Sequence, residues 1–238
     1  MSASSLHRES PLSGGSYLQT LSRGLHVLDI LAALNTAPTA AEIAKLAGLP
    51  MPVTYRVLVT LRAHKMVRVD NDGRYTLGYG LISLGRNVDA DFRLRTHEVL
   101  SSLAQHLGVT VFIGAEDGED FVTISSAEPT RLGTHVRWRD GLRHRMGSGA
   151  GSAAILAARD GAAGSASIDC ISRRYTTSAS EIEPGIQATA FPVVLQDGSC
   201  TMSLVTLQPE DTRPFGTDQL DALRKASRAI AEVASVRR

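Results

Sequence analysis

Two short helical patterns separated by a glycine, over about 39–63, constrain the fold of this chain more than any other segment. Thr39 can cap the first helix, because Glu42 follows it at the spacing of a capping box. Gly48 permits a sharp turn after that helix. Pro52 suits the first turn of a second helix, where its missing N–H costs no hydrogen bond. The sequence therefore predicts a helix, a tight turn and a second helix over about 52–63.

The second of these helices has two chemically different faces. Its inward positions are apolar: Val53, Val57, Leu58 and Leu61. Its outward positions are expected to include hydroxyl groups and cations: Thr54, Tyr55, Arg56, Thr60 and Arg62. Such side chains bind phosphates and base edges, so the pattern indicates a helix–turn–helix whose second helix enters the major groove of DNA.

A small β-hairpin is predicted directly after the second helix. Val67 and Val69 alternate at period two before the turn sequence at 71–73, and Tyr75 and Leu77 alternate after it. Basic residues in or beside the hairpin would contact the DNA backbone, as the wing of a winged helix–turn–helix does: Lys65, Arg68 and Arg74. The alternative is a helical hairpin followed by a β-hairpin whose charges are only solvated.

Charge is distributed unevenly along the chain. Residues 20–97 contain ten Lys and Arg against six Asp and Glu, a net charge of +4, whereas residues 98–238 contain fourteen against seventeen, a net charge of −3. This asymmetry fits an N-terminal part that meets a polyanion. No apolar run approaches the ~20 residues of a membrane span, so no membrane partner is expected. The two cysteines, Cys170 and Cys200, suit a reducing cytoplasm.

The N-terminal region is expected to contain a tail and one core helix. Residues 1–16 are rich in Ser, Gly and Pro and lack the apolar segment of a signal peptide, which predicts a disordered tail. Leucines recur at helical spacing from Leu21 to Leu34, and Val27 and Ile30 widen the stripe. They predict a core helix over about 20–34 that closes an N-terminal domain spanning 17–78.

After Gly78, apolar residues step by three or four from Leu81 to Phe92. They predict one helix or a pair of helices over about 80–107, ending at Gly108. Residues 79–97 are expected to be a linker helix, which can also pack against a second subunit. The alternative for the second half of the segment is an ordinary core helix of the C-terminal domain.

The C-terminal domain, 98–238, alternates between strand and helix patterns. Strands are predicted at 109–113, 121–126, 132–138, 189–195 and 201–207. Helices are predicted at 152–158 and 220–233, with a Gly, Ala and Ser loop over 160–167. This order indicates an α+β fold, in which helices pack against an antiparallel sheet.

Three other features of this domain suggest chemistry. The glycine-rich segment 147–151 lacks the Lys-Ser/Thr of a P-loop, so it fits either backbone packing beside a ligand or a tight turn. The basic stretch 135–145 favours a solvated sheet face over a subunit contact or an anion-attracting rim. His135, Asp140 and His144 do not have the spacing of a metal site, and no Gly-x-Ser-x-Gly motif is present. The sequence thus predicts no metal and no cofactor, and the missing nucleophile motif points away from catalysis.

A series of motifs follows in order along the chain: Arg23-Gly24-Leu25-His26-Val27-Leu28, Glu42-Ile43-Ala44 with Gly48-Leu49-Pro50, Thr54-Tyr55-Arg56-Val57-Leu58-Val59-Thr60-Leu61, Tyr75-Thr76-Leu77-Gly78, Gly149-Ala150-Gly151-Ser152-Ala153, Tyr175-Thr176-Thr177-Ser178 with Glu181 and Gly185, and Ala190-Phe191-Pro192-Val193. In this order and spacing the chain resembles the IclR family of bacterial transcription regulators, over about 20–236. The resemblance implies a winged helix–turn–helix domain, a linker helix and a C-terminal effector-binding domain with a GAF-like fold. It also implies a homodimer or dimer of dimers on double-stranded DNA with a pseudo-palindromic operator.

Together, motif chemistry and resemblance predict two sets of site residues. The DNA-binding set is Thr39, Pro52, Thr54, Tyr55, Arg56, Thr60, Arg62, Lys65, Arg68 and Arg74. The effector-binding set, carried over from the family by position, is Gly149, Ala150, Ser178, Ala188, Val205 and Leu207. Val205 and Leu207 stand where members with acid effectors tend to carry serines, so the resemblance implies a more apolar cup. The expected effector is a mono-anionic or neutral small molecule with an aromatic or branched apolar body.

The leading hypothesis is a cytoplasmic, sequence-specific DNA-binding transcription regulator, with repression favoured, whose operator affinity is modulated by this effector. The alternative is a metabolite-binding enzyme or sensor whose N-terminal domain mediates protein contacts.

Overall fold

The computed structural model describes residues 18–130, 136–160 and 175–235. The predicted tail at 1–16, residues 161–167 of the predicted loop, His135 and Cys170 lie outside this part of the chain. Contacts within the chain divide it into two units after Val88. Each unit is described by itself.

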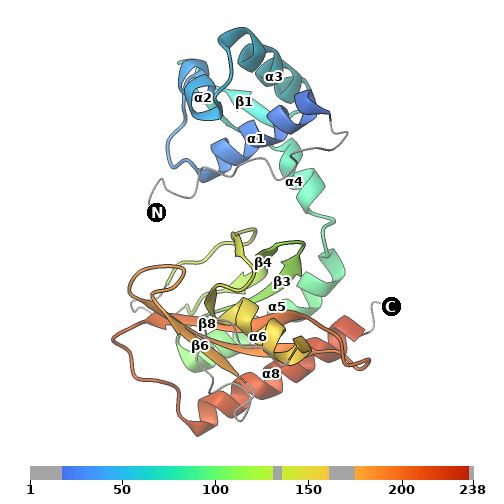
Figure 1. Ribbon diagram of the computed structural model, residues 1–238, viewed down its shortest axis with the longest axis vertical. Coiled ribbons are helices and arrows are strands. Elements are labelled where there is room, and N and C mark those ends of the chain that lie inside the picture. The colour runs from blue at the N-terminus through green and yellow to red at the C-terminus, as the bar shows by residue number, and fades with distance from the viewer. Residues whose placement is uncertain (1–17, 131–135, 161–174, 236–238) are drawn as a thin grey trace. The chain divides into compact units, whose positions relative to one another are not determined.

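The first unit is a winged helix–turn–helix (Figure 1). Its elements are α1 (Gln19–Ala33), α2 (Ala40–Ala47), α3 (Met51–Ala63), β1 (Val67–Val69), β2 (Tyr75–Leu77) and the short helix α4 (Gly80–Gly85). The strands β1 and β2 pair in antiparallel fashion. A small core joins the helices to the hairpin: Val27, Leu31, Ile43, Val57, Leu58 and Val67. The predicted organisation of this region is confirmed.

The turn between α2 and α3 forms as the sequence predicts. The Thr39 N–H donates to a Glu42 carboxylate oxygen at 2.7 Å, and the Glu42 N–H donates to Thr39 Oγ1 at 3.4 Å, which completes the capping box. Gly48 ends α2 at φ 62°, a left-handed conformation in which glycine carries no steric penalty. Pro52 lies in the first turn of α3.

The helix α1 buries only part of the predicted apolar stripe. Leu21 and Leu25 are 59% and 54% exposed, whereas Val27, Ile30 and Leu31 are buried. The spacing was not selective, because leucines and β-branched residues together surround much of this helix. Contacts with α2, α3 and β2 decide which part of the stripe faces the core.

The second unit is a six-stranded antiparallel sheet with helices on both faces (Figure 1). The strand order is β5 (Arg143–Arg145), β4 (Asp120–Ala127), β3 (Thr110–Asp117), β8 (Cys200–Pro209), β7 (Ile186–Val194) and β6 (Thr176–Ala179). The helices α5 (Ala90–Leu107) and α8 (Thr217–Ser235) cover one face, and α6 (Gly149–Asp160) covers the other. The predicted α+β class with an antiparallel sheet is confirmed.

Each face of this sheet has its own apolar core. Successive side chains of a strand point to opposite faces, so Val111 and Ile113 join the core under α5 and α8, whereas Phe112 joins the core under α6. The core under α6 is made of Phe112, Phe121, Ala150, Ala154, Ile155, Ala190, Cys200, Val205 and Leu207. Most predicted effector residues therefore lie on one face of the sheet.

Two short edge strands were not predicted from the sequence, and the described part of one predicted strand is not a strand. Residues 136–138 are not in a strand, and the rest of the predicted strand at 132–138 lies mostly outside the described residues. The strands β5 and β6 form instead at the two edges. They have three and four residues, too few to show a readable alternation.

The segment after Gly78 forms the predicted pair of helices, α4 and α5, and α5 ends at Gly108 with φ 69°. The predicted linker, 79–97, falls in α4, in residues 86–89 and in the first half of α5. Phe92 and Leu100 are buried in the core of the second unit, so α5 is a core helix. None of the described helices is both long and apolar enough to cross a membrane.

Candidate nucleic-acid interface and ligand cavity

The outer face of α3 is exposed and carries cations. Tyr55, Arg56, Thr60 and Arg62 are exposed, as are Pro52 at the start of the helix and Lys65 just after its end. The Thr60 hydroxyl donates to the Arg56 carbonyl at 2.9 Å, so its oxygen remains an acceptor at the surface. This face presents guanidinium, ammonium and phenol groups, which are donors to phosphates and base edges.

Thr54 does not belong to that face, contrary to the prediction. Its side chain is 0% exposed, and Oγ1 donates to the Pro50 carbonyl at 3.2 Å. The residue lies three and four positions before Val57 and Leu58, so the helix places all three on the inward side. A DNA contact through Thr54 is therefore ruled out for this conformation.

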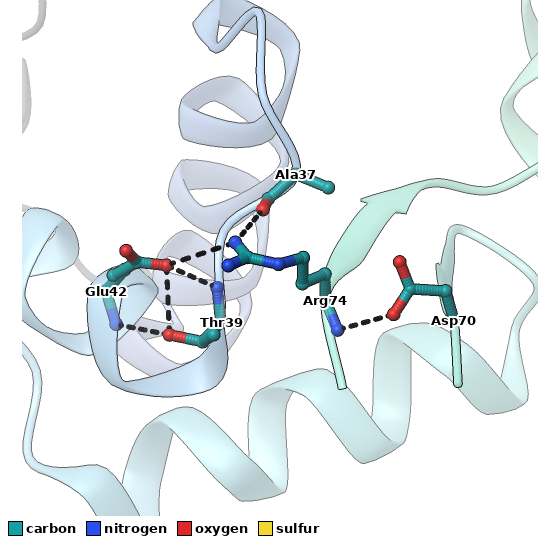
Figure 2. A network of polar contacts seen from close by, with 5 residues as sticks. All are labelled: Ala37, Thr39, Glu42, Asp70 and Arg74. Atoms are coloured by element: carbon teal, nitrogen blue, oxygen red, sulfur yellow. Dashed lines mark hydrogen bonds and ion pairs between the residues drawn. The ribbon is translucent and has the colours of Figure 1, made fainter. Parts of the chain in front are cut away.

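Two of the predicted DNA-binding residues, Thr39 and Arg74, take part in the internal structure of the winged domain. Figure 2 shows Arg74 beside Ala37, Thr39 and Glu42. The Arg74 guanidinium donates to the Ala37 carbonyl at 2.9 Å and lies 3.9 Å from the Glu42 carboxylate. The same Glu42 oxygen accepts from the Thr39 N–H and hydroxyl at 2.7 and 3.0 Å. Thr39 and Arg74 thus connect the hairpin to the start of α2. Their prediction as DNA-binding residues is corrected accordingly, because both side chains are hydrogen-bonded within the domain.

Arg68 is also engaged inside the hairpin. Its guanidinium donates to the Thr76 hydroxyl and to the Tyr79 hydroxyl, both at 3.0 Å, and lies 4.9 Å from the centre of the Tyr79 ring. These bonds hold the side chain along the hairpin. Besides Arg68 and Arg74, which are exposed but hydrogen-bonded within the domain, the predicted DNA-binding residues with exposed polar side chains are Tyr55, Arg56, Thr60, Arg62 and Lys65.

The network around Glu42 changes the titration of its carboxyl group. Hydrogen bonds from the Thr39 backbone and then from the Thr39 hydroxyl lower the pKa of Glu42 below its ordinary 4.5, and Arg74 adds a smaller effect. Glu42 is therefore ionised at pH 7 and holds both the helix start and the wing.

In the second unit, a cavity lies between the sheet and the start of α6. All six predicted effector residues line it: Gly149, Ala150, Ser178, Ala188, Val205 and Leu207. Strand pairing explains why they meet, since Ser178 is opposite Ala188 and Ala188 is opposite Leu207. The space is small, about 30 Å³. That volume suits water rather than an aromatic ring, so a larger ligand requires the lining to move apart.

Aromatic side chains form much of the wall, and the sequence analysis missed them. The further lining residues are Phe112, Phe121, Trp138, His144, Gly151, Glu181, Ile182, Glu183 and Ile186. Phe112 stacks on Trp138 with ring centres 5.4 Å apart, and Phe121 stacks on His144 at 4.9 Å. The alternation of side chains along β3 already placed Phe112 on the other face of the sheet from Val111 and Ile113. The sequence offered no comparable signal for Trp138 or His144.

The Phe121 ring fits against two glycines from different elements. A Cβ at Gly114 would lie 2.1 Å from the Phe121 ring, and a Cβ at Gly151 would lie 2.5 Å from it. Any side chain at either position would overlap the ring. Within the glycine-rich segment at 147–151, Gly151 thus leaves the space that the Phe121 ring of the cavity wall fills.

Two predicted effector-binding residues, Ala150 at the start of α6 and Ser178 in β6, bond to each other. The Ala150 N–H donates to Ser178 Oγ at 3.0 Å. The Thr176 hydroxyl donates to the Ala150 carbonyl at 2.7 Å, and the Ser203 hydroxyl donates to the Gly151 carbonyl at 2.9 Å. The Ala150 amide, although Ala150 belongs to the predicted effector-binding set, is therefore already hydrogen-bonded within the protein.

Burial lowers the pKa of His144, although a bond with the Arg145 carbonyl and the nearby Glu181 and Asp120 act in the opposite direction. Since the ordinary pKa is 6.5, His144 is mainly neutral at pH 7. Its Nδ1 lies 3.1 Å from the Arg145 carbonyl. In the neutral ring a proton on Nδ1 makes this bond and leaves Nε2 as an acceptor.

Two of the four arginines in the stretch 137–145 pair with acids. Arg143 contacts Asp117 at 2.5 Å and Asp120 at 3.5 Å, and Arg145 contacts Glu119 at 2.9 Å. Asp140 pairs with Arg93 at 2.7 Å. Such pairing supports a solvated sheet face rather than an anion-attracting rim. No group of three His, Cys, Asp or Glu that could hold a metal lies within the described ranges.

Comparisons with known proteins agree with both units. Residues 20–71 match the IclR helix–turn–helix domain. The HTH-type transcriptional regulator XynR of Escherichia coli is 30% identical over 114 residues, 47% of this chain and 45% of that protein. The E. coli transcriptional repressor IclR is 31% identical over 110 residues, 45% of this chain and 40% of that protein. These sequence matches span less than half of each curated relative.

Solved structures match nearly the whole chain. An IclR transcriptional regulator from Alicyclobacillus acidocaldarius superimposes with a TM-score of 0.77 at 23% identity, covering 92% of this chain and 99% of that one. An IclR homologue from Microbacterium hydrocarbonoxydans, solved with 4-hydroxybenzoate, gives a TM-score of 0.75 at 16% identity, covering 91% and 99%.

The first unit is thus an IclR-type DNA-binding domain, and the chain as a whole has the fold of IclR-family transcriptional regulators. This confirms the family resemblance. The two curated relatives named here are a transcriptional regulator and a transcriptional repressor.

Proposed function

We propose that this protein is a sequence-specific transcription regulator, acting as a repressor, whose DNA affinity responds to a small organic effector in the cavity. One observation carries the proposal: the IclR-type helix–turn–helix presents Arg56 and Arg62 on the exposed face of α3. In such domains the second helix of the motif enters the major groove. Arg56 would contact a guanine or a phosphate, and Arg62 and Lys65 would contact the DNA backbone.

Exposed apolar residues support self-association of this unit. Leu21 and Leu25 on α1 and Ile82 and Leu84 on α4 are each more than half exposed. Large exposed side chains of this kind mark surfaces that become buried on association. A homodimer or dimer of dimers on a pseudo-palindromic operator follows as part of the proposal, because two-fold proteins bind two-fold sites.

The cavity supports the effector half of the proposal. Its wall consists of aromatic and aliphatic side chains with few polar groups, the usual composition of a small-molecule site. A structural neighbour solved in complex with 4-hydroxybenzoate supports an aromatic ligand for a cavity of this fold. The ligand class expected here is a mono-anionic or neutral molecule with an apolar, aromatic or branched body.

Footprinting on the intergenic region beside the gene, followed by a salt titration of affinity, tests the function. We expect a protected pseudo-palindromic site and a logarithmic salt slope of about −0.9 per phosphate contacted. For variants of the exposed face of α3, such as Arg56→Ala, the matched control is Arg228→Ala, because it removes an exposed cation on α8 in the second unit. No protected site and a flat salt dependence would contradict the proposal and favour a sensor whose N-terminal domain mediates protein contacts.

A further inference from the structure

A ridge of apolar side chains runs along the exposed face of α3. Met51, Tyr55 and Val59 are each between 45% and 57% exposed, and each follows the previous one by four residues. Residues at this spacing are neighbours on one side of a helix, so the three side chains form a continuous strip, the α3 ridge. Single exposed apolar residues are ordinary on protein surfaces, whereas a contiguous group of them marks a surface that becomes buried on binding.

Val59 lies at the middle of the outer face. A helix turns by about 100° per residue, so residues two positions apart lie on nearly opposite sides. The residues two positions before and after Val59 both face inward, since Val57 is buried and Leu61 packs against the core of this unit. Val59 is not part of the core that the described residues 18–88 form. Core packing therefore does not explain a branched apolar side chain at this position.

The residues beside the ridge identify the partner as DNA. Arg56 and Arg62 are exposed and lie three residues before and after Val59, so they flank it on either side. The structure describes the whole of α3, and this helix contains no acidic residue. An apolar strip between two cations matches the major groove, where phosphates border the edges of the bases.

A second copy of this chain is a poorer partner for the ridge. In a two-fold contact the ridge would meet the same surface of the other copy. The contact would then bring Arg56 and Arg62 close to their own equivalents, and like charges at an interface repel each other. The charge of this face therefore favours a polyanion over self-association.

The chemistry of Val59 selects one base. Its side chain contains only carbon and hydrogen, so it cannot bond to the nitrogen and oxygen atoms that base pairs expose in the major groove. Against such a polar edge it would displace water without replacing the lost hydrogen bond. Thymine is the standard base whose major-groove edge carries a methyl group. A valine against that methyl group buries apolar surface from both partners, which stabilises the complex.

We infer that Val59 recognises a thymine in each half-site of the operator by packing against its 5-methyl group. The inference rests on the proposed DNA-binding function and adds to it a residue that determines sequence preference. Arg56 and Arg62 supply the charge on either side of this contact, and Met51 and Tyr55 continue the apolar strip toward the start of α3.

Replacement of thymine by deoxyuridine tests the inference, because it removes only the 5-methyl group from the DNA. Each thymine of the footprinted operator is replaced in turn, at the equivalent positions of both half-sites. Fluorescence anisotropy then measures the affinity of the full-length protein for each duplex. We expect one position per half-site at which the replacement weakens binding about fourfold for each methyl group lost, the effect of one buried methylene group.

Val59→Ala removes the same contact from the side of the protein. Alanine has a higher helix propensity than valine, so α3 should remain folded, as circular dichroism can check. We expect at least about fourfold weaker binding to the thymine operator. At the sensitive position, deoxyuridine should weaken the binding of this variant no further, because the two changes remove one and the same contact. The matched control is Val194→Ala, which shortens an exposed valine of β7 and should keep the wild-type response.

The possible outcomes separate this inference from the proposed function. Specific binding with the same response to deoxyuridine in Val59→Ala and in the wild-type protein would overturn the inference alone, as would an operator in which no thymine is sensitive. Absence of specific binding by the wild-type protein would overturn both. A changed sedimentation coefficient of the folded Val59→Ala variant without DNA would assign the ridge to a contact between copies, and would also overturn the inference.

Discussion

Thr54 and Arg56 are two positions apart on α3 and therefore lie on different faces of the helix. The Thr54 hydroxyl bonds to the Pro50 carbonyl inside the first turn, whereas Arg56 is exposed. One residue supports the helix start, and the other is available to DNA. Substitutions at the two positions are thus expected to separate folding from recognition.

Arg56→Ala should weaken binding to the specific site by about 1–3 kcal/mol, as the loss of a base or phosphate contact does. Thr54→Val keeps the shape of the side chain and should change the affinity by less than about 0.5 kcal/mol in the folded protein. Fluorescence anisotropy with a labelled operator measures both. A larger loss from Thr54→Val than from Arg56→Ala would show that α3 does not present its outer face to DNA.

The second prediction at this scale concerns the titration of Glu42. Its pKa is lowered by the Thr39 backbone bond, then by the Thr39 hydroxyl, and less by Arg74. A lowered carboxyl pKa stabilises the fold above the ordinary value of 4.5, and this contribution is lost as the pH falls through the lowered pKa.

In a ¹³C NMR titration, Glu42 should therefore have a midpoint below 4.5. Thr39→Val should raise the midpoint more than Arg74→Ala does, because the hydroxyl bond has the larger effect. The reverse order, with Arg74→Ala giving the larger shift, would mean that the ion pair rather than the capping box controls this carboxyl group.

The sequence predicts the position of a residue when its contacts are local along the chain. It does not predict contacts between residues that are far apart in the chain. Thr54 shares the spacing of Val57 and Leu58, so periodicity alone placed it inside, and its hydroxyl chemistry misled the assignment. The partners of Arg74 are Ala37 and Glu42, which follow no local period. Long-range contacts of this kind become visible only when the fold brings the hairpin to α2.

At the scale of elements, β3, β4 and α6 meet around one ring. Phe121 of β4 lies over Gly114 of β3 and against Gly151 of α6, and both glycines leave the space that the ring fills. The cavity wall therefore depends on this three-element contact. The sequence predicted the glycine-rich segment but not its partner, because Phe121 is about thirty residues earlier in the chain.

Gly151→Ala should destabilise the second unit by about 1–3 kcal/mol, because the new methyl group would lie 2.5 Å from the Phe121 ring. Gly24→Ala in α1 is the matched control, since the nearest atom to its Cβ would be 4.0 Å away. That substitution should stabilise the first unit by about 0.5–1 kcal/mol through helix propensity.

Chemical denaturation of the two variants measures these effects, and Phe121→Leu should relieve part of the loss when it is combined with Gly151→Ala. If the two glycine variants changed the free energy of unfolding equally, the Phe121 ring would be able to move away from the new methyl group. The contact with Gly151 would then not determine the position of the cavity wall.

At the scale of the whole molecule, the DNA-reading face and the cavity lie in different units of contact. The connection between them runs through α4, residues 86–89 and α5. A space of about 30 Å³ is too small for an aromatic ring, so binding must favour a state in which the lining is open. The ligand can change DNA affinity only if that open state also differs in how well it binds DNA.

The family motifs placed all six predicted residues at one cavity, because sheet register fixes which residues of β6, β7 and β8 are neighbours. The width of the cavity and the charge of its lining were not predictable in the same way. They depend on Ile182, Glu183 and Trp138, which come from connections between strands, where the sequence has no periodic signal.

The coupling between the two units is measurable in both directions. A saturating aromatic ligand should change the operator affinity by about 5–150-fold, and saturating operator DNA must change the ligand affinity by the same factor. Ala188→Leu adds carbon at the half-buried position between Ser178 and Leu207 and should block the cavity. In this variant the operator should bind as it does to the wild-type protein without ligand, because the substitution lies outside the DNA-binding unit. Anisotropy titrations with and without ligand give both factors. If the ligand still changes the operator affinity of a folded Ala188→Leu variant, the effector acts elsewhere on the protein, and this cavity is not the site that controls DNA binding.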